Sequence, residues 1–158
     1  MNAPVAELHE PSPAGALLDP QGNRAAHKYS RSEQLRRALW VLGEIAIRVS
    51  PRPCFAWRRM VLRLFGAKVG REVHLYSSTR IYMPWNVEIG DWAALGEDVF
   101  IYSLGKVSIG ACVALPSRAH VCAGTHDFSD PALPLLKPSV VIEDGAWLLR
   151  HVTELSAQ

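Results

Sequence analysis

Aliphatic residues recur in the second half of the chain with a period of twenty, and within each period they are six residues apart. The positions concerned are all Val, Leu or Ile, and they are Val69, Leu75, Ile81, Val87, Ile89, Leu95, Ile101, Val107, Ile109, Leu115 and Val121. A step of six fits neither the 3.6-residue period of a helix nor the alternation of a single strand. It predicts a solenoid in which three short strands form one triangular coil and the aliphatic side chains fill a central prism. We expect the two further residues of each period to be absorbed at one corner.

The positions four residues after these aliphatic ones support the same fold. They are mostly small or β-branched, as a narrow corner requires, with Trp85 as the exception: Val73, Thr79, Ala93, Val99, Gly105, Val113, Ala119 and Thr125. Glycine follows the aliphatic residue at Gly70, Gly90, Gly96 and Gly110, where we expect it to permit tight turns. The alternative is an ordinary β-sandwich, but sandwich strands do not hold a fixed phase through three turns.

Two helices are predicted before the coils. Residues 30–49 have helical periodicity, with Ser32 as N-cap and Pro51 after the end. The apolar face of this helix is expected to consist of Leu35, Ala38, Leu39, Leu42, Ile45, Ala46 and Val49. A second helix is expected from residue 54 or 55 to Phe65, with Gly66 as C-cap. It mixes arginines with bulky apolar residues, which suits either contact with an anionic membrane surface or a cap over the open end of the solenoid.

The domain organisation follows from these patterns. Residues 1–29 are expected to be a disordered leader, 30–66 a helical cap and 67–148 the solenoid. Three prolines between residues 127 and 139 exclude a central strand there and predict a loop that leaves the prism. The hexapeptide phase resumes at Ile142, and residues 149–158 form an atypical tail.

Composition narrows the function only a little. A net charge of +2 in 158 residues argues for neither nucleic acid nor a strongly acidic partner. Three cysteines without a CxxC pair do not predict a zinc site, and we expect no metal. The chain opens without a basic-then-apolar signal sequence, and its longest apolar stretch, 38–43, is too short to span a bilayer. The expected location is the cytoplasm.

One of the six histidines is placed where a catalytic group would be expected. His126 closes a coil just before the proline-rich loop, so that it lies on a rigid scaffold beside a mobile cover. A neutral imidazole can take a proton from a hydroxyl group near neutral pH. Asp127 follows directly and is a candidate to orient the ring or to fix its tautomer. From position alone, an ordinary surface histidine remains the alternative.

Several motifs together resemble the hexapeptide-repeat acyltransferases. They are Trp57-Arg58-Arg59, the run 62–70, Pro84-Trp85-Asn86, Ile89-Gly90-Asp91, Tyr102 and the segment 122–128 with Gly124-Thr125-His126-Asp127. Within that superfamily the chain is most similar to the colanic acid biosynthesis acetyltransferase group, over about residues 31–147. The hexapeptide pattern is specific for the fold, whereas Pro-Trp-Asn with Gly-Thr-His-Asp is more specific for the group.

The resemblance implies an all-β solenoid of the left-handed parallel β-helix type with N-terminal α-helices, and a homotrimer with one active site in each cleft between neighbouring chains. It implies acetyl-CoA as co-substrate and a saccharide or lipid-linked saccharide as acceptor. His126 matches the family's catalytic base, with Asp127 beside it. Candidates for coenzyme binding are Ala146 and Trp147, and candidates for acceptor binding are Trp85, Asn86 and Phe128. Packing at a prism corner is the alternative role for Trp85.

The resemblance stops after Trp147. Leu149 and Arg150 occupy positions where the family has a glycine and a small residue along the path of the coenzyme. We therefore expect a C-terminally truncated family member. Two alternatives to an active O-acetyltransferase remain open at this point, namely a truncated and inactive relative or a non-catalytic trimeric scaffold.

Overall fold

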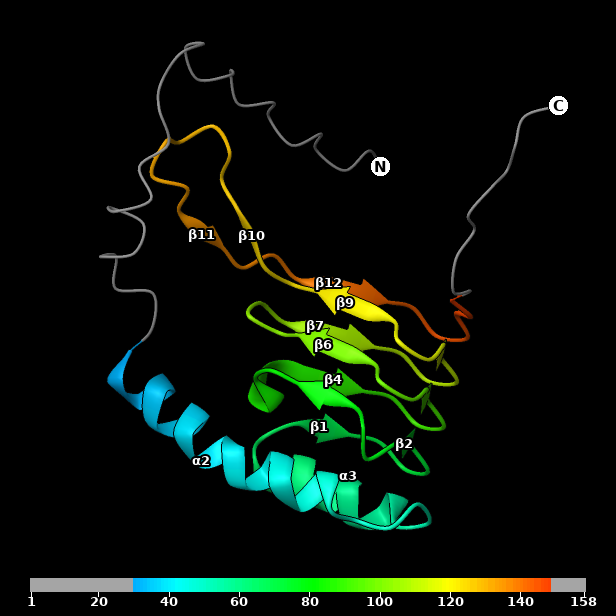
Figure 1. The fold of residues 1–158 in the computed structure, drawn as a ribbon. Helices are drawn as coiled ribbons and strands as arrows, with labels where there is room; N and C mark the ends of the chain where they lie inside the picture. Colours follow the sequence, from blue (N-terminus) through cyan, green and yellow to red (C-terminus); the bar gives the residue numbers. More distant parts are fainter. Residues whose placement is uncertain (1–29, 149–158) are drawn as a thin grey trace, which may run out of the picture.

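In the computed structural model, residues 30–148 are described, and they form two helices followed by a three-sided coil of short strands (Figure 1). The helices are α2 (Arg31–Arg48) and α3 (Phe55–Leu64). The strands are β1 (Lys68–Val69), β2 (His74–Leu75), β3 (Arg80–Ile81), β4 (Val87–Ile89), β5 (Ala94–Leu95), β6 (Phe100–Tyr102), β7 (Val107–Ile109), β8 (Ala114–Leu115), β9 (His120–Cys122), β10 (Thr125–His126), β11 (Leu135–Leu136) and β12 (Val140–Ile142). The predicted leader and tail lie outside the described residues.

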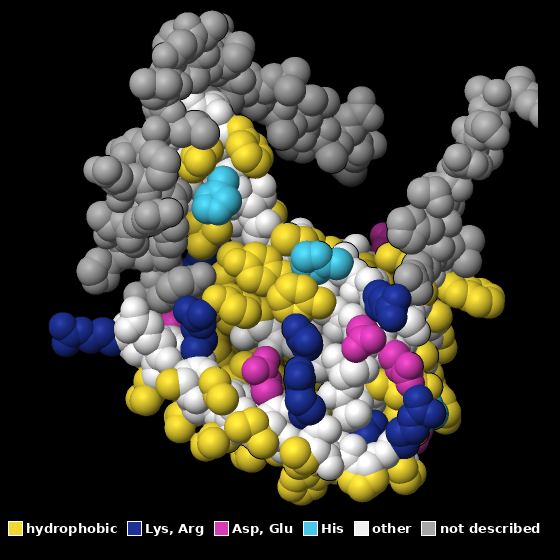
Figure 2. Space-filling view, viewed as in Figure 1, with side chains coloured by type: hydrophobic (Ala, Val, Ile, Leu, Met, Phe, Trp, Pro, Cys, Tyr) yellow, Lys and Arg dark blue, Asp and Glu magenta, His cyan; other side chains and the backbone are white. Residues whose placement is uncertain are grey.

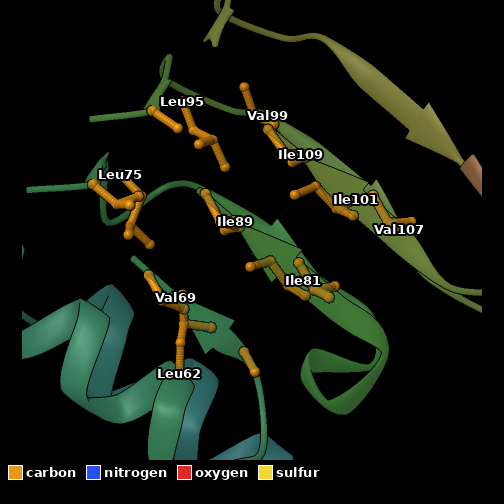
Figure 3. Close-up of a cluster of buried hydrophobic side chains, with 14 of the residues drawn as sticks. Leu62, Val69, Leu75, Ile81, Ile89, Leu95, Val99, Ile101, Val107 and Ile109 are labelled. Atoms are coloured by element: carbon orange, nitrogen blue, oxygen red, sulfur yellow. The ribbon is translucent and has the colours of Figure 1, made fainter. Parts of the chain in front are cut away.

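Three parallel sheets form the sides of the coil, with strand orders β1-β4-β7-β12, β2-β5-β8 and β3-β6-β9. Partners in the regular coils lie twenty residues apart, as in Val69 with Ile89 and Leu75 with Leu95. The eleven repeated aliphatic residues are all at most 9% exposed, and their side chains fill the interior of the coil (Figure 3). The period of twenty is therefore confirmed as one turn of the coil. Each turn buries a similar set of side chains, so the core continues from one turn to the next.

The sequence predicted that the two further residues of each period lie at a corner, and this prediction is wrong. They lengthen one strand: Val87 and Ile89 both point inward from β4, and Val107 and Ile109 do the same from β7. Two residues along a strand point to the same face. The side formed by β4 and β7 therefore has two inward positions where the β2 and β3 sides have one.

The glycines of the coils serve close approach between turns, which corrects the prediction that they supply unusual backbone angles. A Cβ atom on Gly90 would lie 2.5 Å from the backbone nitrogen of Ala111, and one on Gly70 would lie 2.6 Å from that of Asp91. Positive φ angles occur two residues later instead, at non-glycine positions such as Trp92 (62°) and Cys112 (55°). Stacked turns leave no room for a side chain at these glycine positions.

The predicted loop interrupts the coil without changing its register. Ile142 of β12 pairs with Ile109 of β7, thirty-three residues earlier in the chain, whereas other partners are twenty apart. The excess equals the thirteen residues 127–139. β10, directly before the loop, and β11 within it form a small antiparallel pair that projects from the end of the prism (Figure 1). Trp147 then pairs with Ala114 in a parallel bridge, so the chain resumes its earlier course.

The helices close the N-terminal end of the prism. Leu62 of α3 is fully buried and points toward Val69 of the first turn (Figure 3). Helix α2 packs on α3 and buries Trp40 and Ile47, and the Trp40 ring nitrogen donates to the carbonyl oxygen of Ile81 at 2.7 Å. The cap predicted from the sequence is thus present. Its N-cap is Ser30 rather than Ser32, and Ser30 forms a capping box with Glu33.

The side of α2 predicted to face the protein faces outward. Leu35 is 62% exposed, Leu42 64% and Val49 74%, whereas the residues that pack inward are Trp40, Gly43 and Ile47. Gly43 is needed because a Cβ atom there would lie 2.4 Å from the Trp40 ring. The helix has apolar residues on both sides. The prediction assigned the wider apolar stripe to the core, whereas the narrower one with Trp40 and Ile47 is buried.

Arg58 ties the two helices and the first turn together. It is fully buried, and its guanidinium donates to the Ser50 hydroxyl at 2.8 Å and to the carbonyl oxygens of Leu75 and Arg52 at 3.0 and 3.1 Å. Two more hydrogen bonds reach the carbonyl oxygens of Ser50 and Pro51. Burial lowers the pKa of Arg58 from its ordinary value, because the charged form loses water. Five donors in a fixed fork suit this cluster of acceptors.

Candidate active site

His126 lies at the C-terminal end of the prism, on the last residue of β10. It is paired in register with Leu135 of β11, so the antiparallel pair fixes its backbone on both sides. The ring is half-buried. The hexapeptide pattern carries the chain up to this point, and the proline-rich segment then turns it away from the prism. His126 is therefore held where the regular coil ends.

The ring of His126 is oriented by the loop itself. Its Nδ1 atom lies 2.7 Å from the carbonyl oxygen of Leu133. Because a carbonyl oxygen only accepts, the neutral ring carries its proton on Nδ1 and leaves the Nε2 lone pair available. A histidine held in this tautomer can act as a general base through Nε2. Leu133 itself has a positive φ of 48°, which turns the chain where its carbonyl meets the ring.

The sequence did not single out Leu133, because the interaction uses a backbone atom and any residue could supply it. Asp127 was the candidate for orienting the ring. In the structure, Asp127 Oδ1 accepts hydrogen bonds from the Ser129 backbone nitrogen at 2.9 Å and from the Ser129 hydroxyl at 2.5 Å. The Asp127 backbone nitrogen donates to the Pro134 carbonyl oxygen at 3.0 Å. Asp127 thus shapes the loop, and the Leu133 carbonyl oxygen meets the His126 ring.

The returning strand of the loop passes directly against the prism at Gly105. A Cβ atom on Gly105 would lie 2.1 Å from the carbonyl oxygen of Pro138 and 2.7 Å from that of Lys137. Gly105 was predicted only as a small corner residue, but the structure shows that it admits the loop. Phe128, a candidate for acceptor binding, is 81% exposed on the outgoing side of the same loop. The loop thus presents an exposed ring close in sequence to His126.

Trp85 and Asn86 lie at the corresponding corner two turns earlier, in a short 3₁₀ helix (Pro84–Asn86). The Trp85 ring packs against the core and lies under the guanidinium of Arg36, whose central carbon is 4.3 Å from the ring centroid. The Asn86 side chain donates to the carbonyl oxygens of Ser103 and Leu104 at 2.9 and 3.1 Å. Successive turns are about 4.8 Å apart, so this corner is about 10 Å below the level of His126. Asn86 links its turn to the next one, and Trp85 packs between the core and Arg36 of α2.

Ala146 and Trp147 lie on another side of the prism. Trp147 is 78% exposed and is in register with β8, whereas His126 follows β9 on the adjacent side. In Figure 1 the segment after β12 lies at the right edge of the coil, whereas the β10–β11 pair projects at the upper left. One chain therefore does not bring the coenzyme candidates and His126 together. A small residue such as Ala146 leaves room for the extended arm of a coenzyme, and an exposed ring such as that of Trp147 offers a face for its adenine ring.

Aromatic side chains cover the outer surface of the β3-β6-β9 sheet, the side that ends at His126. Tyr82 and Tyr102 have ring centroids 4.9 Å apart, and Phe100 stacks on His120 at 4.9 Å. Burial raises the pKa of the Tyr102 hydroxyl, with a smaller contribution from Tyr82. Within residues 30–148, no group of three His, Cys, Asp or Glu side chains is placed to hold a metal ion.

Comparison with known proteins confirms the resemblance seen in the sequence motifs. The chain is 34% identical over 113 residues to WcaF of Escherichia coli (strain K12), a proposed colanic acid biosynthesis acetyltransferase, and equally to WcaF of Shigella flexneri. The alignment covers 72% of this chain and 62% of each relative, so the chain spans less than two thirds of the length of these proteins. No family model matches the sequence.

Solved structures agree on the fold. The hexapeptide-repeat-containing acetyltransferase VCA0836 from Vibrio cholerae superposes with a TM-score of 0.67 at 18% identity, over 75% of this chain and 68% of that one. The same protein complexed with acetyl coenzyme A gives 0.62 at 16% identity, over 75% and 72%. A maltose O-acetyltransferase from Clostridium difficile 630 gives 0.61 at 14% identity, over 75% and 71%. The fold is therefore that of the hexapeptide-repeat acetyltransferases.

Proposed function

We propose that this chain is an acetyl-CoA-dependent O-acetyltransferase that acts on a hydroxyl group of a saccharide precursor of an exopolysaccharide, with His126 as the general base. The observation that carries the proposal is the hydrogen bond between His126 Nδ1 and the Leu133 carbonyl oxygen, at 2.7 Å. It leaves Nε2 as a proton acceptor at the end of a rigid prism. The name of the relatives in Escherichia coli and Shigella flexneri supports the class of acceptor.

The chemistry assigned to His126 is a single proton transfer. Acetyl-CoA, when bound, supplies a thioester carbonyl carbon and a thiolate leaving group. Nε2 of His126 removes the proton from the acceptor hydroxyl as its oxygen forms a bond to that carbon, and the carbon–sulfur bond then breaks. The Leu133 carbonyl stabilises the imidazolium through its Nδ1 proton. General-base catalysis of this kind is typically worth about 10²–10⁴ in rate.

The proposal includes a homotrimer with left-handed coils. His126 and the candidates Ala146 and Trp147 lie on different sides of one prism, and packing of prisms side by side brings such sides together. Closed rotational symmetry gives each pair of neighbours the same cleft. In each cleft, His126 of one chain faces the exposed Trp147 of the next, while Phe128 borders the acceptor side. Trp85 and Asn86, two turns earlier at the same corner, line the lower part of the acceptor side.

The test measures coenzyme A release from acetyl-CoA with a panel of saccharide acceptors. We expect His126→Gln to lower kcat by about 10²–10⁴ and to leave acetyl-CoA affinity nearly unchanged, because the ring acts on the acceptor proton. His74→Gln is the matched control. His74 is an exposed histidine on β2 in the first turn, where it stacks on Phe55 at 4.5 Å, and its substitution should leave kcat within about twofold.

Binding and mass measurements separate this function from its alternatives. Calorimetry with acetyl-CoA and light scattering should give a coenzyme-binding particle of three chains. A folded trimer that ignores acetyl-CoA would favour a non-catalytic scaffold instead. Protein that binds neither coenzyme nor its own copies would favour an inactive relative. Full activity in His126→Gln would remove His126 as the base.

A further inference from the structure

The outer face of the helical cap is apolar along its whole length. Its members are large hydrophobic side chains that are at least 45% exposed, and we call them the basal face: Leu35, Leu39, Val41, Leu42, Ile45, Val49, Trp57, Met60 and Leu64. In the space-filling view they form a yellow border along the lower edge of the molecule, over α2 and α3 (Figure 2). Such a large contiguous patch on a folded protein marks an interaction site.

The basal face is built as one surface. On each helix its members, Val41 apart, are spaced three and four residues from one to the next, which aligns them along one side, and Val41 lies next to Ile45 at the edge of that side. The Trp57 ring nitrogen donates to the carbonyl oxygen of Ala46 at 3.1 Å, so the two helices are held together at this face. The opposite sides of α2 and α3 bury Trp40 and Leu62 in the protein. The exposed apolar residues therefore cannot turn inward without breaking the cap.

Positive charge is concentrated in the same segment. Residues 31–66 contain eight arginines and two glutamates, a net charge of +6. The remainder of the chain contains nine lysines and arginines against thirteen acidic residues, a net charge of −4. Arg31 and Arg48, at the two ends of α2, are exposed, and within residues 30–148 neither takes part in an ion pair.

We propose that the basal face docks on an anionic lipid bilayer, with the prism standing on its helical end. Apolar side chains enter the boundary between headgroups and acyl chains, and the exposed Arg31 and Arg48 lie among the lipid phosphates. The helices lie along the bilayer surface, because their opposite sides are buried in the protein. None of the described helices combines the length and the apolar character of a membrane span. The inference does not depend on the proposed transferase activity.

Charge decides between a bilayer and a second copy of the chain as the occupant. Two basal faces packed on each other would bring together the exposed Arg31 and Arg48 of both copies, and like charges repel across such an interface. An anionic leaflet instead attracts the same segment, with about 1 kcal/mol for each arginine near the surface, or about fivefold in affinity. In a trimer with parallel prisms, the three basal faces would also lie at the same end and bind together.

The test is flotation of the purified chain with vesicles of phosphatidylcholine, with and without phosphatidylglycerol. We expect the protein to float with the anionic vesicles and less with the neutral ones. Leu39→Gln/Leu42→Gln should weaken binding at least about tenfold, because two exposed leucines no longer enter the bilayer. Arg31→Gln/Arg48→Gln should weaken binding to anionic vesicles by about fivefold for each arginine and flatten its salt dependence.

Trp92→Asn is the matched control for the leucine variant. Trp92 is 64% exposed, as is Leu42, but it lies at a corner of the second turn, and asparagine tolerates its positive φ of 62°. This variant should bind vesicles like the wild type. The proposal fails if the wild type does not float, or if the leucine variant and the arginine variant both float as well as the wild type. It also fails if light scattering shows that the wild type self-associates, that Leu39→Gln/Leu42→Gln abolishes this association, and that this variant still floats like the wild type.

Discussion

The regular coils and the loop at their end are built on different principles. In the coils, residues are paired with residues twenty positions away, as Lys68 is with Glu88 at 2.7 Å. In the loop, the contact that orients the catalytic candidate is local, between His126 and Leu133. The coils place His126 and supply stability, while the loop orients its ring. A change in one region should therefore leave the property of the other largely intact.

Removing the loop should separate the stability of the coils from the activity of the site most completely. Deletion of residues 127–139 joins His126 to Val140 and restores a spacing of twenty between Ile109 and Ile142. The register of β7 and β12 is then the same as in the intact chain, so we expect the free energy of unfolding to change by less than about 1 kcal/mol. Acetyl transfer should fall by at least about 10², because the Leu133 carbonyl is gone.

Urea unfolding and the coenzyme A release assay measure the two effects on the same preparation. Loss of the fold together with activity would show that the loop stabilises the coils, contrary to the comparison. Retained activity would exclude the loop as the support of the base.

Arg58→Met tests the opposite region. The variant leaves the Ser50 hydroxyl and four backbone carbonyl oxygens without their buried donor, so we expect a loss of about 3 kcal/mol in the free energy of unfolding. The protein that remains folded should bind acetyl-CoA like the wild type. Arg52→Met is the control, since its pair with Glu97 is largely exposed and contributes less than about 1 kcal/mol. Equal losses in both variants would contradict the structural role of Arg58.

Gly90→Ala sharpens the account of how the turns stack. The new Cβ atom would lie 2.5 Å from the Ala111 nitrogen, and the backbone of two turns would have to separate, at a cost of about 2 kcal/mol. Gly145→Ala meets no atom within 4 Å and carries only the strain of a φ of 71°, about 1 kcal/mol. Thermal unfolding of both variants compares the two effects. A larger loss at Gly145 would favour backbone angle over close approach.

The smallest expected effect concerns pH. Hydrogen bonds from Lys68 and then Lys106 lower the pKa of Glu88 below its ordinary value of 4.5, and the Arg71 backbone and side chain lower that of Asp91. Groups whose pKa is lower in the folded state stabilise it above their unfolded value, and this contribution is lost as the pH falls through the folded value. Urea midpoints should therefore decrease below pH 4.5, and less steeply in Glu88→Gln. An identical decrease in that variant would exclude Glu88 as a contributor.

The sequence predicted the coil well because one physical demand is repeated. Val69, Ile89 and Ile109 occupy the same place in successive turns, so each confirms the others. His126 stood out because the repeat stops beside it. The cap and the orienting group were harder to predict. Helix α2 is apolar on two sides, and a single sequence does not tell which side meets the protein.

Local pattern by itself determined the twenty-residue turn, the inward aliphatic residues, the two helices and the position of the inserted loop, because these depend on residues that repeat or lie close in the chain. The tertiary structure decided that Gly90 lies against the next turn, that the Leu133 carbonyl oxygen meets the His126 ring, and that Leu42 faces outward. Each of these depends on which backbone or side-chain atoms meet across turns or across a loop. The pattern of residue types along the chain does not predict such contacts when the partner is a backbone atom, because every residue has the same backbone carbonyl group.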